Sequence, residues 1–157
     1  MTGLYTVAIL THSWLRWLVL PLMLGRIGKA IVDRSQDKPY EGPARGFTAA
    51  TVGMMDLMLL IGVVLLGWLS PLTTSAMSDM GAAMGDPVRR FWLVEHPTMM
   101  FLALVVAHVG SVMARRASDA KRAHTIVAVA LSVAFLMLLA GIPWPFREGI
   151  GRPLFNL

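Results

Sequence analysis

Two histidines, His12 and His96, are the residues of this chain whose type and position most clearly suggest chemistry. Each lies inside a long apolar segment, where an ionisable side chain is costly and usually has a specific partner. Imidazole is also a common metal ligand and exchanges protons near neutral pH. We therefore take His12 and His96 as candidate ligands of one haem iron, bound by an imidazole on each face.

The absence of cysteine restricts the kind of redox centre that this chain can hold. Without thiols it forms no disulfide, no cysteine-ligated iron–sulfur cluster and no covalent C-x-x-C-H haem attachment. Any redox metal must be bound by histidine, methionine or carboxylate side chains. Haem b, which needs no covalent attachment, is the cofactor that we expect.

Arg16 follows His12 by one helical turn and is a second candidate for cofactor binding. A planar guanidinium is well suited to a haem propionate or to a quinone oxygen. An alternative is an internal ion pair with Asp56, because both residues lie near the middle of their apolar segments. The sequence leaves both roles open for Arg16.

The remaining histidines, His108 and His124, fit a shared site less well. His108 follows His96 by twelve residues, so the two lie about 120° apart around one helix. His124 directly follows a basic cluster and has the position of an interfacial residue. A second haem between them is therefore a weaker hypothesis.

The amino-acid composition indicates that these residues lie in a membrane protein. Of the 157 residues, 56% are hydrophobic and only 15% are charged, whereas charged residues make up about 25% of a typical soluble domain. The mean hydropathy is +0.65. Four apolar runs each approach the ~20 residues that cross a membrane as a helix. We predict one integral membrane domain, residues 1–157, with helices at about 4–30, 47–70, 91–115 and 123–143.

The positive charges indicate a topology. The net charge is +5, but the Lys and Arg residues gather in the first and third connections instead of forming a stripe that would bind nucleic acid. By the positive-inside rule, these two connections face the cytoplasm. The predicted fold is all-α, an up-down-up-down bundle of four transmembrane helices with both termini outside.

This topology places His12 and His96 in the same leaflet. His12 is about eight residues into the first span and His96 about five into the third, so their depths differ by roughly 5 Å. The first and third helices of such a bundle are normally diagonal. Two histidines facing each other across the bundle can ligate one haem, with the other helices packed at its edges.

Three stretches of the sequence resemble a known family: HSWLRW at 12–17, RFWLVEHPTMM at 90–100, and GIPWPFR at 141–147 followed by GRPLF at 151–155. Together they resemble a small family of bacterial four-helix membrane proteins labelled cytochrome b-like. The resemblance covers most of the chain. It implies a multi-pass protein of the bacterial inner membrane, with His12 and His96 at the family's histidine positions.

The leading hypothesis is a b-type cytochrome-like subunit that holds haem between the first and third helices for electron transfer. The expected partners are the lipid bilayer, a quinone and other membrane-protein subunits, and not nucleic acid. The alternative is a non-catalytic accessory or scaffold subunit of a larger respiratory or photosynthetic complex, which explains the small size equally well. A copper or small-solute transporter is a third class, suggested by the twelve methionines.

Overall fold

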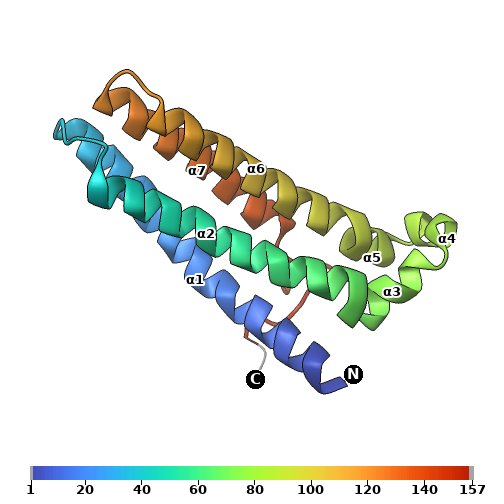
Figure 1. The fold of residues 1–157 in the computed structure, drawn as a ribbon. Coiled ribbons are helices and arrows are strands. Elements are labelled where there is room, and N and C mark those ends of the chain that lie inside the picture. Colours follow the sequence, from blue (N-terminus) through green and yellow to red (C-terminus); the bar gives the residue numbers. More distant parts are fainter. Residues whose placement is uncertain (1, 156–157) are drawn as a thin grey trace.

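The computed structural model describes residues 2–155, which form an all-helical bundle (Figure 1). Four long helical segments run alternately up and down, and short helices join the second segment to the third. In chain order the elements are α1 (Thr2–Ser35), α2 (Gly42–Val64), η1 (Leu65–Leu69), α3 (Pro71–Met77), α4 (Met80–Gly85), α5 (Pro87–Arg90), η2 (Phe91–Glu95), α6 (His96–Arg115) and α7 (Ala120–Gly141). The predicted all-α fold, with four long apolar helices running up and down, is confirmed.

The long segments have the properties of membrane spans. Four of them, Gly3–Ser35, Gly42–Leu69, Pro87–Arg115 and Ala120–Gly141, are long and apolar enough to cross a bilayer. Only 22% to 39% of the residues in their most apolar windows are buried within the protein. Most of this apolar surface therefore faces outward, as expected for helices surrounded by lipid.

The arrangement of the long helices places α1 and α6 diagonally. Each of them packs along both α2 and α7, so α1 and α6 face each other across the bundle interior (Figure 1). The core between them contains fully buried aliphatic side chains such as Val19, Val127 and Leu131. This is the diagonal relation that was predicted for the two histidine-bearing helices.

The third span is irregular just before His96, which is the first residue of its regular α-helical part. Phe91–Glu95 forms a π-helical turn, and the backbone N–H of His96 donates to the carbonyl of Phe91 five residues earlier. Proline at position 97 has no N–H, so the regular ladder cannot continue through this turn. The helix widens there and His96 becomes the first residue of α6.

Close packing of α6 against α7 depends on Gly110. A Cβ added at this position would overlap the Cβ of Ala130 on α7. The neighbouring Ala107 and Ala114 are also fully buried, so small residues allow the two backbones to approach closely.

We expect Gly110→Ala to destabilise the bundle by about 1–3 kcal/mol, because the added methyl group must push α6 and α7 apart. Denaturant titration in detergent, followed by circular dichroism, measures this change. Gly28→Ala is the matched control, since an added Cβ at position 28 meets nothing within 4 Å. An equal loss of stability in both variants would contradict the proposed packing constraint.

The carboxylate of Asp119 caps the start of α7. It accepts a hydrogen bond of 2.8 Å from the backbone N–H of Arg122, and this bond lowers the pKa of Asp119 below its ordinary value. The charged form is therefore favoured in the folded protein. Its stabilising effect is present above the unfolded pKa of about 3.9 and is lost as the pH falls through the lower folded value.

Asp119→Ala should therefore lower the melting temperature most near neutral pH and progressively less in acid. Thermal melts of wild type and variant between about pH 3 and pH 7 measure the difference. Asp119→Asn is the control, because an asparagine cap does not titrate in this range. A melting-temperature difference that grows in acid would show that the cap does not act through its charge.

Candidate functional site

His12 on α1 and His96 on α6 meet inside the bundle. Their ring centroids are 6.5 Å apart and the ring planes cross at 75°. Two imidazoles on opposite sides of one metal ion, with bonds of about 2 Å, have ring centroids roughly 6 Å apart. The two histidines predicted from the sequence are therefore brought together at a separation that suits two ligands of one metal.

His96 is held by a specific hydrogen bond. Its Nδ1–H donates to the backbone carbonyl of Gly141, at the end of α7, over 2.8 Å. That carbonyl belongs to the last turn of the helix, where no helical N–H is available to it. With the proton on Nδ1, the Nε2 atom carries a lone pair, which is the arrangement typical of a metal-ligating histidine.

His12 lies against the backbone of α2. A Cβ added at Gly62 would lie 3.2 Å from the Cε1 atom of His12, so a larger residue there would have to displace the ring by a few tenths of an ångström. The Nδ1 atom of His12 is buried and makes no hydrogen bond of 3.5 Å or less in the described part of the chain, although the backbone of Met58 lies close enough to act on the ring. A buried nitrogen without a partner is unfavourable and is consistent with a role in binding a ligand.

Both histidines line a cavity of about 270 Å³ between α1, α2, α6 and the C-terminal segment. Its walls are mostly apolar, with contributions from α2 and α6 such as Met58 and Met100. Two cationic side chains, Arg16 and Arg152, also line it. The cavity thus combines an apolar interior, two imidazoles and positive charge.

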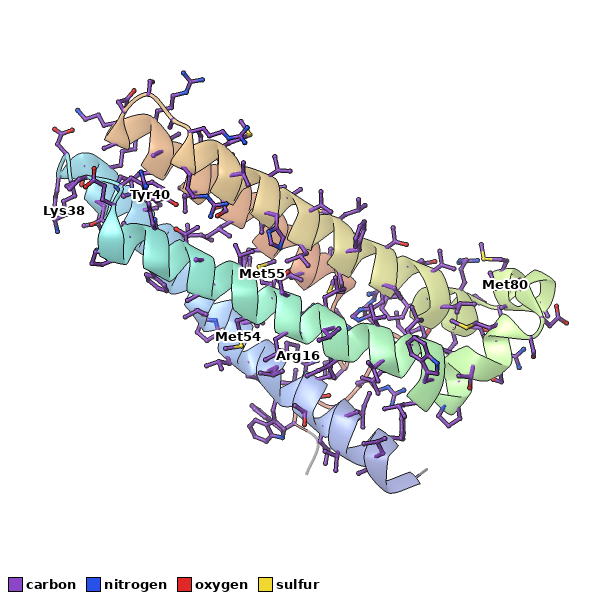
Figure 2. The ribbon with its side chains drawn as sticks, in the orientation of Figure 1. Arg16, Lys38, Tyr40, Met54, Met55 and Met80 are labelled. Atoms are coloured by element: carbon purple, nitrogen blue, oxygen red, sulfur yellow. The ribbon has the colours of Figure 1, made fainter. Side chains whose placement is uncertain are left out.

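Arg16 lies midway along the bundle, well separated from Lys38 and Tyr40 at one end and from Met80 at the other (Figure 2). Its Nη2–H donates to the carbonyl of Leu154 over 3.0 Å. The Nε atom is buried without a partner among the described residues. Arg16 therefore retains binding capacity toward the cavity.

The predicted ion pair between Arg16 and Asp56 is not formed, and that hypothesis is wrong. Asp56 instead accepts a hydrogen bond of 2.8 Å from His108 Nε2 on α6. Both side chains are about half exposed, on the outside of the bundle. The matching depth of Arg16 and Asp56 indicated a possible contact, but the orientation around each helix places the two residues apart.

The C-terminal segment 142–155 was not predicted to form part of the site. It runs back along the bundle so that Leu154 accepts hydrogen bonds from Arg16 and from the indole of Trp17. The Phe155 ring stacks on Trp17 at 5.3 Å. Arg152 lies 4.9 Å from the ring centroid of Trp92. This segment therefore covers one side of the cavity and supplies one of its arginines.

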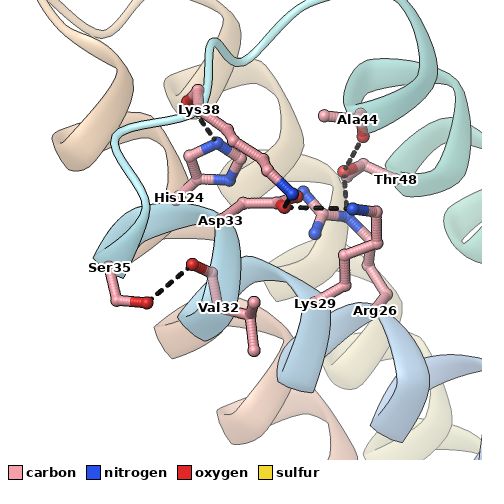
Figure 3. A network of polar contacts seen from close by, with 9 residues as sticks. All are labelled: Arg26, Lys29, Val32, Asp33, Ser35, Lys38, Ala44, Thr48 and His124. Carbon is pink, nitrogen blue, oxygen red and sulfur yellow. Dashed lines mark hydrogen bonds and ion pairs between the residues drawn. The ribbon is translucent and has the colours of Figure 1, made fainter.

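His124 belongs to a separate buried cluster near the loop between α1 and α2 (Figure 3). Its Nε2–H donates to the carbonyl of Lys38 over 3.1 Å. In the same cluster the fully buried Arg26 donates to Thr48, and Asp33 accepts from Lys29. These contacts fasten the loop to the helices, so His124 has a structural role and does not pair with His108.

The structure describes no group of three or more histidine, cysteine, aspartate or glutamate side chains able to hold a metal ion within residues 2–155. His12 and His96 form a pair and not such a group, and they are the candidate site because of their separation and their place in the cavity. Searches of protein-family models, curated proteins and solved structures find no match to this chain. The resemblance to cytochrome b-like proteins stays a prediction.

Proposed function

We propose that this protein is a membrane cytochrome that holds one haem b between His12 and His96. The observation that carries the proposal is the pairing of these two imidazoles across the bundle interior, 6.5 Å apart. A bis-histidine site in an apolar setting is characteristic of haem centres used for electron transfer.

The side chains present fit the donor set and the charge of haem b. Two neutral imidazoles suit the iron, and Arg16 and Arg152 suit the two propionates. The cavity of about 270 Å³ is smaller than the ~300–1,000 Å³ typical of ligand sites. Haem binding therefore requires lining side chains to turn aside, and Met58 and Met100 are flexible enough to do so.

Each residue has a defined part in the proposed function. His12 and His96 hold the iron, and the hydrogen bond from His96 to Gly141 fixes the ring orientation and its basicity. The apolar walls exclude water, while Arg16 balances negative charge near the centre. When bound, haem supplies reversible one-electron exchange, whose potential is adjusted by ligation, burial and nearby charge.

The proposed location is the bacterial inner membrane, with both termini outside. Support comes from the basic residues in the loops between α1 and α2 and between α6 and α7, which favour the cytoplasmic side. The histidines would then lie toward the outer face. We propose that electrons pass between a quinone or another membrane subunit and a partner at that face.

The test is to purify the full chain in mild detergent from haem-replete cells and to measure pigment and haem per chain. The expected result is a reduced-minus-oxidised b-type spectrum with about one haem per chain. A colourless but folded and monodisperse protein, unable to take up added haem, would overturn the proposal. The accessory-subunit alternative would then become the leading function.

A further inference from the structure

The polar pair formed by Asp56 and His108 lies on the outside of the bundle, within two membrane spans. Asp56 is near the centre of the Gly42–Leu69 span. The exposed fractions of the two side chains are 47% for Asp56 and 51% for His108. Ionisable residues inside membranes almost always face a protein interior or a water-filled cavity. Exposure of this pair to lipid would be unfavourable.

Each residue of the pair has unused hydrogen-bonding capacity. His108 uses Nε2 and Asp56 uses Oδ1 in their mutual bond. The second ring nitrogen and the second carboxylate oxygen have no partner among residues 2–155. Lipid tails offer neither donors nor acceptors, so these two atoms are left without a hydrogen bond where the pair faces lipid.

The surroundings of Asp56 are suited to a close helix contact. Gly46, Ala49, Gly53, Asp56 and Leu60 follow one another every three or four residues on one exposed face of α2. A Cβ added at Gly46 or Gly53 would meet nothing within 4 Å. Small residues on an exposed face let a second helix come near enough for polar side chains to bond across the contact.

We propose that this face of α2 and α6 is the interface between two copies of this chain in the membrane. The pair is self-complementary: it carries a carboxylate acceptor and an imidazole that, when protonated, donates from both nitrogens. Under twofold symmetry, His108 of each copy donates to Asp56 of its own chain and to Asp56 of the other.

The charge pattern favours a second copy over an unrelated subunit. An unrelated partner would have to present both an acid and a base in the matching order, whereas twofold symmetry supplies them automatically. The interface does not involve His12 or His96, so it is independent of the proposed haem site. Failure of one proposal leaves the other unaffected.

Single-cysteine crosslinking in native membranes tests the interface. The chain has no cysteine, so every disulfide must come from an introduced residue. Gly53→Cys and Leu60→Cys on the proposed interface should each give a disulfide-linked dimer with a mild oxidant. Val129→Cys is the matched control, because it is 58% exposed on α7, which lies diagonally across the bundle from α2.

A second comparison tests the role of the polar pair. Adding Asp56→Leu and His108→Leu to Gly53→Cys should lower the dimer yield roughly tenfold, because the bonds between the copies are lost while the exposed face stays apolar. Crosslinking no stronger at positions 53 and 60 than at 129 would overturn the interface. Linkage to a different protein would overturn the second copy as the occupant, and an undiminished dimer in the double-leucine background would overturn the role of the pair.

Discussion

Replacing His12 or His96 by alanine is expected to remove haem from the purified protein. Loss of a residue that merely orients a metal ligand lowers metal affinity by about 10–100-fold, and loss of the ligand itself should exceed this. We therefore expect each single variant to retain only a small fraction of its pigment, and the double variant to retain none. The measurement is haem per chain after identical purification.

His108→Ala is the control for this experiment. It removes a histidine of the same helix that carries His96 but that pairs with Asp56 outside the bundle. We expect it to keep the full haem content. Retention of haem by a folded double variant, His12→Ala with His96→Ala, would contradict the ligand assignment, whatever the behaviour of the control.

Gly151→Ala is expected to release the C-terminal segment from the site. An added Cβ would lie 2.8–2.9 Å from three backbone carbonyl oxygens, those of Trp144, Pro145 and Arg147. Backbone atoms in a tight turn cannot move aside without distorting the turn. Such overpacking lowers the stability of the folded segment by about 1–3 kcal/mol. The turn should open, and the contacts of Leu154 with Arg16 and Trp17 should weaken.

The consequence is expected in the rate at which haem is lost. With the segment released, transfer of haem to an excess of apomyoglobin should be roughly tenfold faster than for wild type, a change that corresponds to about 1.4 kcal/mol. Gly67→Ala is the matched control, because an added Cβ at position 67 meets nothing within 4 Å. Equal transfer rates for the two variants would show that the segment does not close the site.

The four-helix fold was predictable because its signals are local. Apolar runs of the right length and the sorting of basic residues are visible without knowledge of packing. The predicted ranges differ from the helices at their ends: the fourth range runs past the end of α7 at Gly141, whereas α1 continues beyond its range to Ser35, where an ion pair from Lys29 to Asp33 supports its last turns. A helix end made of polar residues lies outside the apolar run, so the hydropathy of the sequence does not reveal it.

The site was only partly predictable. Depth along the helices indicated that His12 and His96 could meet, and their contact in the structure agrees with this expectation. Depth alone also suggested an ion pair between Arg16 and Asp56, and that prediction is wrong. Depth along a helix contains no information on the rotation of a residue about the helix axis. The bond between Asp56 and His108 joins residues 52 positions apart and depends on that rotation.

The contribution of residues 142–155 had the weakest signal in the sequence. These residues have no helical periodicity, and their basic side chains slightly opposed the predicted topology. Their place is determined by long-range contacts, such as Arg152 over Trp92 and Phe155 on Trp17. Contacts between residues so far apart in the chain are set by the assembled bundle and have no counterpart in local sequence patterns.

The most direct test of the central claim is low-temperature electron paramagnetic resonance of the oxidised protein. Two imidazole ligands on one iron predict a low-spin ferric signal from a single haem per chain, unchanged by His108→Ala and lost in the variant with alanine at both positions 12 and 96. A high-spin signal as the main species would contradict ligation by both His12 and His96. A low-spin signal that survives in the double variant would assign the haem to other residues.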